Sequence, residues 1–180
     1  MVVPEPRLVF VVMAGLPGVG KSSIARGLAL ELGLCLLELD RIEAPLLERI
    51  SGDTLGWSGY EILTSLADDH LALGHSVILD CVTWVRSLRA SWANLAHVRG
   101  AAFRPIEVVC SDEALHRTRL LQRRQQSTGL GDIAWERVEE ARGLYETWDT
   151  SRLELDSAYA LEDLVRAAAA YVVSSSPADP

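Results

Sequence analysis

The chain has 180 residues, of which 49% are hydrophobic and 23% charged, and its formal net charge is −8. This length and composition are typical of one folded domain, and they exclude wholesale disorder, collagen-like repeats and a multi-domain assembly. The negative charge disfavours nucleic acid and anionic membranes as general partners, because their phosphates would repel the average face of the protein.

The cysteines and the N-terminus indicate the compartment. The three cysteines are an odd number and stand at the edges of apolar runs, so we expect thiols in a reducing cytoplasm rather than a disulfide framework. The apolar run at residues 8–13 is too short to span a bilayer, and an acid and two prolines precede it, unlike a signal peptide. We therefore expect a cytoplasmic protein without a membrane partner, either a monomer or a homodimer.

Apolar runs of strand length alternate with longer segments of helical spacing. This alternation predicts βαβ units, whose strands form a parallel sheet with helices on both faces. We expect an α/β three-layer sandwich with a five-stranded sheet over residues 1–173, followed by a disordered tail at 174–180. The expected strands are 8–14, 35–39, 76–79, 106–110 and 153–155, and the expected helices are 22–32, 44–73 with a break around 51–59, 85–99, 112–126, 133–148 and 161–173.

The strongest motif stands between the first expected strand and the first expected helix. Residues 15–22 read Gly-Leu-Pro-Gly-Val-Gly-Lys-Ser and fit G-x-x-x-x-G-K-[ST] at each fixed position. Glycines allow a curved loop whose backbone N–H groups converge on phosphate oxygens, and the following helix favours an anion at its N-terminus. In this pattern the lysine reaches the β- and γ-phosphates, and the serine hydroxyl holds Mg²⁺. The residues expected to bind a nucleoside triphosphate are Gly15, Leu16, Pro17, Gly18, Val19, Gly20, Lys21, Ser22 and Ser23.

Lysine usage supports this interpretation. Of the 17 basic residues, 16 are arginine and only Lys21 is lysine. Because the chain otherwise uses arginine, a position that keeps a compact ammonium indicates a chemical requirement for it. The alternative is a chance glycine-rich turn with a lysine retained by chance, and the buried strand before the loop and the helix after it argue against that alternative.

These features together resemble a known family. The loop near the N-terminus, an Asp after the second strand and an Arg-x-x-x-Arg helix after the fourth are similar to the small P-loop kinases of the AAA_33 type. Among these are the shikimate, gluconate, adenylate and polynucleotide kinases, the chloramphenicol phosphotransferases and the zeta-toxin-like kinases. The resemblance implies the strand order 2-3-1-4-5, an Arg-rich lid at about residues 117–142, and transfer of the γ-phosphoryl group of ATP with Mg²⁺.

Asp40 is the candidate base for the acceptor. It ends the apolar run of the second expected strand, and ligands of parallel α/β sheets bind beyond the carboxyl ends of strands. A carboxylate there can take the proton of an attacking hydroxyl group, the role that the resemblance implies. A helix N-cap is the alternative interpretation. In shikimate kinase an acid two residues earlier helps the metal, and Glu38 stands at that position here.

Asp80 closes the third expected strand after three apolar residues, the form of a Walker B strand. A carboxylate at this place can accept a hydrogen bond from Ser22 or from a metal-bound water. We therefore expect Ser22 and Asp80 to form the magnesium site.

Arg119 and Arg123 are four residues apart and share one face of an expected helix. The resemblance implies that Arg119 stacks on the base and that Arg123 clamps the transferring phosphoryl group, for which a planar guanidinium is suited. A solvated helix face paired with acids is the alternative interpretation.

The acceptor pocket is expected after Asp40 and Asp80, because both segments leave the carboxyl ends of strands that flank the loop. Tryptophan offers a stacking surface for a ring-bearing acceptor. The candidate acceptor-binding residues are Asp40, Arg41, Trp57, Trp84 and Arg86. The histidines at positions 70, 75, 97 and 116 are expected to be surface or core residues without metal-ligand spacing.

Three functions fit these motifs. The first is an ATP-dependent phosphotransferase acting on a hydroxyl of a small molecule such as an antibiotic, a sugar or a nucleotide sugar. The second is a kinase of nucleic-acid 5′ ends, for which residues 81–127 supply eight arginines against three acids within a chain that is otherwise acidic. The third is a nucleotide-binding ATPase or regulator without an acceptor.

Overall fold

The computed structural model describes residues 8–50, 55–126 and 134–174, and for residues 123–126 it describes the backbone only. Within these residues a five-stranded sheet has the order β2-β3-β1-β4-β5, and each neighbouring pair is parallel. This confirms the expected α/β fold and strand order. The strands are β1 (Val9–Ala14), β2 (Cys35–Glu38), β3 (Val77–Asp80), β4 (Ala102–Val109) and β5 (Leu153–Asp156).

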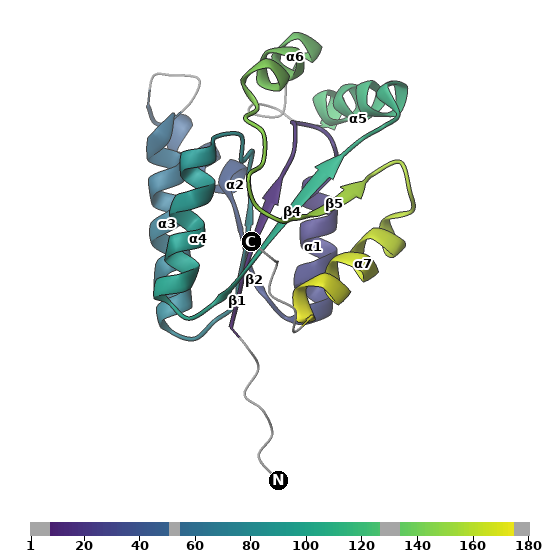
Figure 1. Ribbon diagram of the computed structural model, residues 1–180. Coiled ribbons are helices and arrows are strands. Elements are labelled where there is room, and N and C mark those ends of the chain that lie inside the picture. Colours follow the sequence, from purple (N-terminus) through teal and green to yellow (C-terminus); the bar gives the residue numbers. More distant parts are fainter. Residues whose placement is uncertain (1–7, 51–54, 127–133, 175–180) are drawn as a thin grey trace.

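Helices cover both faces of the sheet (Figure 1). α1 and α7 lie on one face, α3 and α4 on the other, and α5 and α6 lie beyond the carboxyl ends of the strands. None of the described helices combines the length and apolar character that crossing a membrane would require. The helices are α1 (Lys21–Leu32), α2 (Leu39–Leu47), α3 (Trp57–Ala72), α4 (Arg86–Val98), α5 (Glu113–Gln126), α6 (Trp135–Leu144) and α7 (Leu161–Val173).

The central strand β1 shows why the sheet is buried on both sides. Val11 and Met13 pack into the core formed with α1 and α7, whereas Phe10 and Val12 pack into the core formed with α3 and α4. Successive side chains of a strand point to opposite faces, so a strand covered on both faces needs an apolar residue at every position. The continuous apolar run in the sequence is the direct result of this requirement.

Strand β4 begins at Ala102, four residues before the expected start. The first half of the strand was not predicted, because Arg104 and Pro105 interrupt its apolar pattern. Arg104 is buried, donates a hydrogen bond to the Ser174 carbonyl oxygen at 2.8 Å, and lies over the ring of Tyr171. Pro105 lies in the part of β4 that β5 does not pair, since that ladder starts at Ile106. A missing N–H group is tolerated in such an edge region.

Candidate active site

The loop between β1 and α1 curves at the carboxyl end of β1. Gly15, Gly18 and Gly20 have φ angles of +126°, +80° and +101°, which residues with a Cβ rarely adopt. A Cβ at Gly15 would stand 2.1 Å from the Val108 carbonyl oxygen, and a Cβ at Gly18 would stand 2.4 Å from Leu120 Cδ2. Glycine is therefore needed for the curvature of the loop and for its close approach to β4 and α5.

This geometry predicts the cost of adding one methyl group to the loop. We expect Gly15→Ala to lower the free energy of unfolding by about 3 kcal/mol, because the new Cβ combines an unfavourable φ with an overlap on a backbone carbonyl that cannot swing away. Gly33→Ala is the matched control: its φ is +66°, but nothing lies within 4 Å of the added Cβ. That variant should lose only about 1 kcal/mol. Urea unfolding of both variants measures the difference, and equal losses would contradict the steric argument.

The loop leads into α1, whose first residue is Lys21 and whose N-cap residue Gly20 makes no side-chain cap hydrogen bond. The N-terminal end of this helix therefore has the amide groups and the dipole that bind an anion. Lys21 is only 8% exposed, and its Nζ donates a hydrogen bond to the Leu16 carbonyl oxygen at 2.8 Å. The ammonium thus lies inside the curve of the loop, where it can reach a bound phosphate.

Asp80 closes β3, as expected, and its side chain is buried beside Lys21. Burial raises the pKa of the Asp80 carboxyl, and the charge of Lys21 and a hydrogen bond with Ser22 oppose this rise. A buried carboxylate joined to a hydroxyl group offers hard oxygen ligands, and a divalent cation there would favour the ionised carboxylate. Ser22 and Asp80 therefore fit a magnesium ion.

Asp40 lies in the first turn of α2, not at the end of β2, which stops at Glu38. The expected strand-end position is thus wrong, and so is the alternative of an N-cap, because Glu38 occupies the N-cap position. The strand runs into the helix without a loop, and an acid in the first helical turn interacts favourably with the helix dipole. Asp40 nevertheless lines the same cavity as Lys21 and Asp80, and its charge contributes to raising the pKa of Asp80.

Glu38 is occupied by two arginines at the rim of this cavity. It pairs with Arg26 of α1 at 2.6 Å and with Arg41 of α2 at 2.7 Å. The side chain that the resemblance connected to the metal is therefore engaged in a network between α1 and α2. Arg41, a candidate acceptor-binding residue, lines the cavity through this network.

Arg119 reaches the loop from α5. Its guanidinium donates to the Ser157 hydroxyl at 2.7 Å and to the Ser157 carbonyl oxygen at 2.8 Å. A Cβ built on Gly20 would lie 3.8 Å from Arg119 Nη1, so the guanidinium stands directly beside the phosphate loop. The side chain of Arg123 and residues 127–133, the expected lid tip, lie outside the described residues.

His116 is a site residue that sequence reasoning missed. It is 2% exposed, and its Nε2 lies 2.7 Å from the Pro17 carbonyl oxygen. Because a carbonyl oxygen can only accept, Nε2 carries the proton. Burial lowers the pKa of His116, and the charges of Arg142, Lys21 and Arg119 lower it further against the opposing hydrogen bond to Pro17. His116 therefore fastens α5 to the phosphate loop as a neutral donor.

α6 packs on the same helix through Trp135. The Trp135 and His116 rings meet edge to face with centroids 5.1 Å apart, and the Arg117 guanidinium lies 3.9 Å from the Trp135 ring centroid. Both helices of the expected lid region thus contact each other above the carboxyl ends of the strands (Figure 1). His116 thus contacts both the phosphate loop, through Pro17, and α6, through Trp135.

Three candidate acceptor residues lie elsewhere. Trp57 is 55% exposed and lines a groove between α3 and α4, and neither Trp84 nor Arg86 belongs to the described residues that line the phosphate-loop cavity. Arg86 instead contacts Thr147 and Asp149 after α6. Strand-end position and the stacking surface of tryptophan predicted these residues, but Trp57 begins α3, and Trp84 and Arg86 stand just before α4 and at its start, outside the lining of the cavity.

Most of the remaining predicted residues that the structure describes line one cavity of about 650 Å³ at the carboxyl ends of β1, β2 and β3. Gly15, Leu16 and Val19 belong to the loop but do not line this cavity. A phosphate loop before a helix, a buried lysine and a carboxylate ending the neighbouring strand define the class of P-loop proteins, and the sheet order is that of the P-loop kinase fold. Comparison with protein families narrows this class. The AAA_33 family, described as an AAA domain, matches residues 10–146, and the chain belongs to this family.

Solved structures share the fold at low sequence identity. A sugar kinase from Janibacter sp. HTCC2649 is 21% identical with a TM-score of 0.65, and the match covers 91% of this chain and 94% of that one. A gluconokinase from Sinorhizobium meliloti 1021 is 20% identical with a TM-score of 0.68, covering 93% and 91%. An APS kinase from Mycobacterium tuberculosis, solved with AMPPNP and APS, is 19% identical with a TM-score of 0.64, covering 91% and 96%. A search of curated proteins found no match.

Proposed function

We propose that the chain is an ATP-dependent kinase that transfers the γ-phosphoryl group of ATP, with Mg²⁺, to a hydroxyl group of a small molecule such as an antibiotic, a sugar or a nucleotide sugar. The observation that carries this proposal is one cavity lined by Lys21, Asp80 and Asp40, in which the charges of Lys21 and Asp40 both act on Asp80. Residues 1–173 would form one kinase domain, with residues 117–142 as its lid. The kinases of similar fold, named for sugar, gluconate and APS, support a small acceptor.

On the donor side, the residues at positions 15–23 would hold the phosphates. Lys21 would stabilise charge on the β- and γ-phosphate oxygens, and Arg119 would stack on the base next to the β5–α7 segment that holds it. Arg123 would clamp the transferring group. Mg²⁺, held through Ser22 and Asp80, would neutralise charge on the phosphate oxygens.

On the acceptor side, Asp40 would accept the proton of the attacking hydroxyl group. As the acceptor oxygen bonds to the γ-phosphorus, the bond from that phosphorus to the bridging oxygen breaks and ADP leaves. Arg41 would orient the acceptor from the rim of the cavity, and the network of Glu38 with two arginines would keep both helices in register there. The other three candidate residues lie outside the cavity. They would contact the acceptor only if their segments moved toward it; these residues are Trp57, Trp84 and Arg86.

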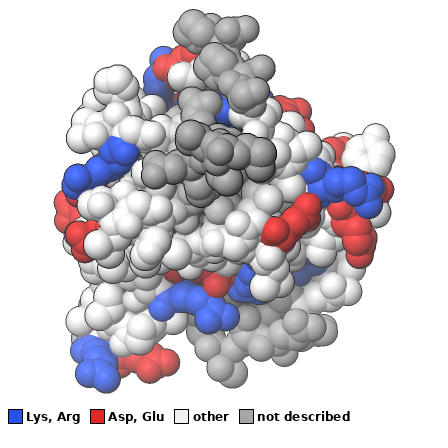
Figure 2. All heavy atoms as spheres, turned by 90° about the horizontal axis from the view of Figure 1, so that it is seen from below, with Lys and Arg blue, Asp and Glu red and all other residues white. Residues whose placement is uncertain are grey.

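Charge distribution argues against a nucleic-acid acceptor. Of the three arginines that line the cavity among the described residues, two pair with an acid: Arg26 and Arg41 both contact Glu38, at 2.6 and 2.7 Å. Figure 2 shows the opposite end of the molecule, at the amino ends of the strands, where basic and acidic side chains also lie next to each other. A kinase of nucleic-acid ends would need a continuous positive groove to bind the phosphate backbone.

The test is an acceptor screen with purified protein and Mg²⁺–ATP, read by mass spectrometry of the products. Sugars, nucleotide sugars and hydroxyl-bearing antibiotics form the main arm, an oligonucleotide with a free 5′-hydroxyl the second, and protein with ATP alone the third. We expect a small molecule to gain one phosphoryl group. Phosphorylation of the oligonucleotide alone, or release of inorganic phosphate at the same rate in all arms, would refute the proposal in favour of a nucleic-acid kinase or an ATPase.

A further inference from the structure

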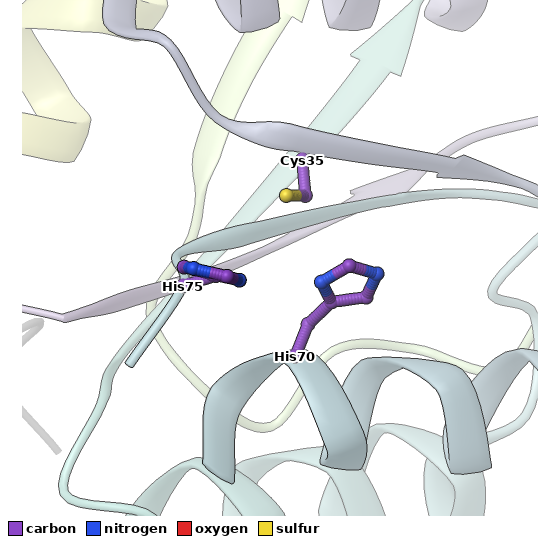
Figure 3. A group of neighbouring side chains, drawn as sticks. All are labelled: Cys35, His70 and His75. Atoms are coloured by element: carbon purple, nitrogen blue, oxygen red, sulfur yellow. The ribbon is translucent and has the colours of Figure 1, made fainter. Parts of the chain in front are cut away.

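Far from the phosphate loop, three side chains with metal-binding atoms gather at the amino end of β2. Cys35 begins β2, His70 lies in the last turn of α3, and His75 stands before β3. One sulfur and two imidazole nitrogens from these residues all lie within 4.8 Å of one another. Figure 3 shows the two imidazole rings approaching each other from opposite sides, with the thiol above the space between them.

The backbone holds these side chains in place before any metal binds. After α3, the N–H of His75 donates to the His70 carbonyl oxygen at 2.9 Å, and the N–H of Gly74 donates to the Leu71 carbonyl oxygen at 3.0 Å. With Gly74 at a φ of +80°, this is a Schellman motif, which fixes His75 beside His70. The N–H of Cys35 donates to the Ser76 carbonyl oxygen at 3.0 Å, so strand pairing brings the thiol to the same place.

A second observation points to a ligand. His70 Nδ1 is fully buried and has no hydrogen-bond partner among the described residues. A buried ring nitrogen without a partner is costly, and an imidazole nitrogen in that state is satisfied by a metal as well as by a hydrogen bond. The C-terminal end of a helix also favours positive charge, and His70 stands in the last turn of α3.

We propose that Cys35, His70 and His75 bind one Zn²⁺ ion, with a fourth position left for water. Sulfur and imidazole are the ligands that zinc prefers, and the spacing of the two histidines falls within that of zinc-binding pairs. Tetrahedral zinc places its ligand atoms about 3.5 Å apart, so small rotations of the side chains close the site. The ion fastens the edge strand β2 to the end of α3, and the thiol releases its proton to solvent on binding.

This proposal departs from the expectation that His70 and His75 are surface or core residues without metal-ligand spacing. The spacing of His70 and His75, with four residues between them, could have indicated a metal-binding pair from the sequence. The third ligand stands 35 positions before His70 and comes close to the pair only because β2 pairs with β3.

The test is titration of the untagged, chelator-treated and reduced protein with Zn²⁺ and separately with Co²⁺, in excess Mg²⁺ to occupy the cavity at the phosphate loop. We expect one ion per chain, a tetrahedral Co²⁺ spectrum with a thiolate charge-transfer band, and a rise in Tm of about 5 °C with zinc. Cys35→Ser should remove the charge-transfer band, and His75→Ala, a change at an exposed position, should weaken binding about 100-fold.

Cys110→Ser and His97→Ala are the controls, because they remove one thiol and one exposed imidazole that lie outside the cluster. Both should bind zinc like the wild type. Absence of Zn²⁺ binding by the wild type would overturn the proposal. Equal binding by the wild type, Cys35→Ser and His75→Ala would also overturn it, because the ion would then lie elsewhere. The proposed kinase activity is not involved in either outcome.

Discussion

Lys21→Ala is expected to lower the rate of phosphoryl transfer by about 10³-fold, because it removes a cation placed inside the curve of the phosphate loop. The side chain is buried between the Leu16 carbonyl oxygen and Asp80, and the sequence has no second lysine that could replace it. Transfer should be measured with the acceptor found in the screen, and Mg²⁺–ATP affinity by calorimetry. Loss of the ammonium should also raise the pKa of Asp80, because the charge of Lys21 holds it down.

Two further variants separate the reasons for this loss. Lys21→Arg keeps the charge but brings a larger planar group into a position that is only 8% exposed. We expect this variant to be as inactive as Lys21→Ala. Arg166→Ala removes a cation from the surface of α7, where Arg166 pairs with Asp163, and should keep full activity. If Lys21→Ala retains turnover within tenfold of the wild type, the assignment of the loop to catalysis is wrong.

The central part of the fold could be predicted because its physical requirements are visible in the sequence. A strand covered on both faces must be apolar along its buried length, as β1 is throughout and β3 is up to Asp80, and the glycines of the loop have positive φ angles that other residues avoid. The strand order came from the resemblance to the small P-loop kinases, since the alternation of strands and helices is compatible with more than one order.

Other elements were concealed because tertiary contacts override local preferences. An arginine such as Arg104 is expected at the surface. In the structure it is buried, because its guanidinium donates to the Ser174 carbonyl oxygen and packs over the Tyr171 ring. The first turn of α2 follows β2 without any turn residue, so its start was placed too late. Local sequence patterns carry no information about partners that are distant along the chain.

The site divides in the same way. Lys21, Ser22 and Asp80 belong to a local motif and to the end of an adjacent strand, and the structure brings them together. His116 and Ser157 reach the loop from segments about 100 and 140 residues further along the chain. The sequence around these two residues contains no motif that would place them at the loop. Trp57 was selected because aromatic residues often line pockets, but its ring packs on Tyr60 at the α3–α4 groove.

Asp40→Asn should separate catalysis from structure on the acceptor side. An amide cannot take the proton of the attacking hydroxyl, so we expect turnover to fall by about 10² to 10⁴-fold while the Kd for Mg²⁺–ATP does not rise. The change also removes a negative charge that contributes to raising the pKa of Asp80 and of Glu43, so both carboxyls should ionise more readily. Nucleotide affinity that is unchanged or slightly stronger is therefore the expected direction.

The matched control is Asp163→Asn, because Asp163 lies in the first turn of α7 as Asp40 lies in the first turn of α2. Each variant removes a favourable charge from a helix N-terminus, so each should lose about 0.5 kcal/mol of stability in urea unfolding. Only Asp40→Asn should lose turnover, since Asp163 pairs with Arg166 and is not among the described residues that line the cavity. If Asp40→Asn weakens ATP binding as much as it slows transfer, Asp40 holds α2 against the loop and another group must accept the proton. Glu43 would then be the next residue to test, because it is buried one turn further along α2, close enough for Asp40 to raise its pKa.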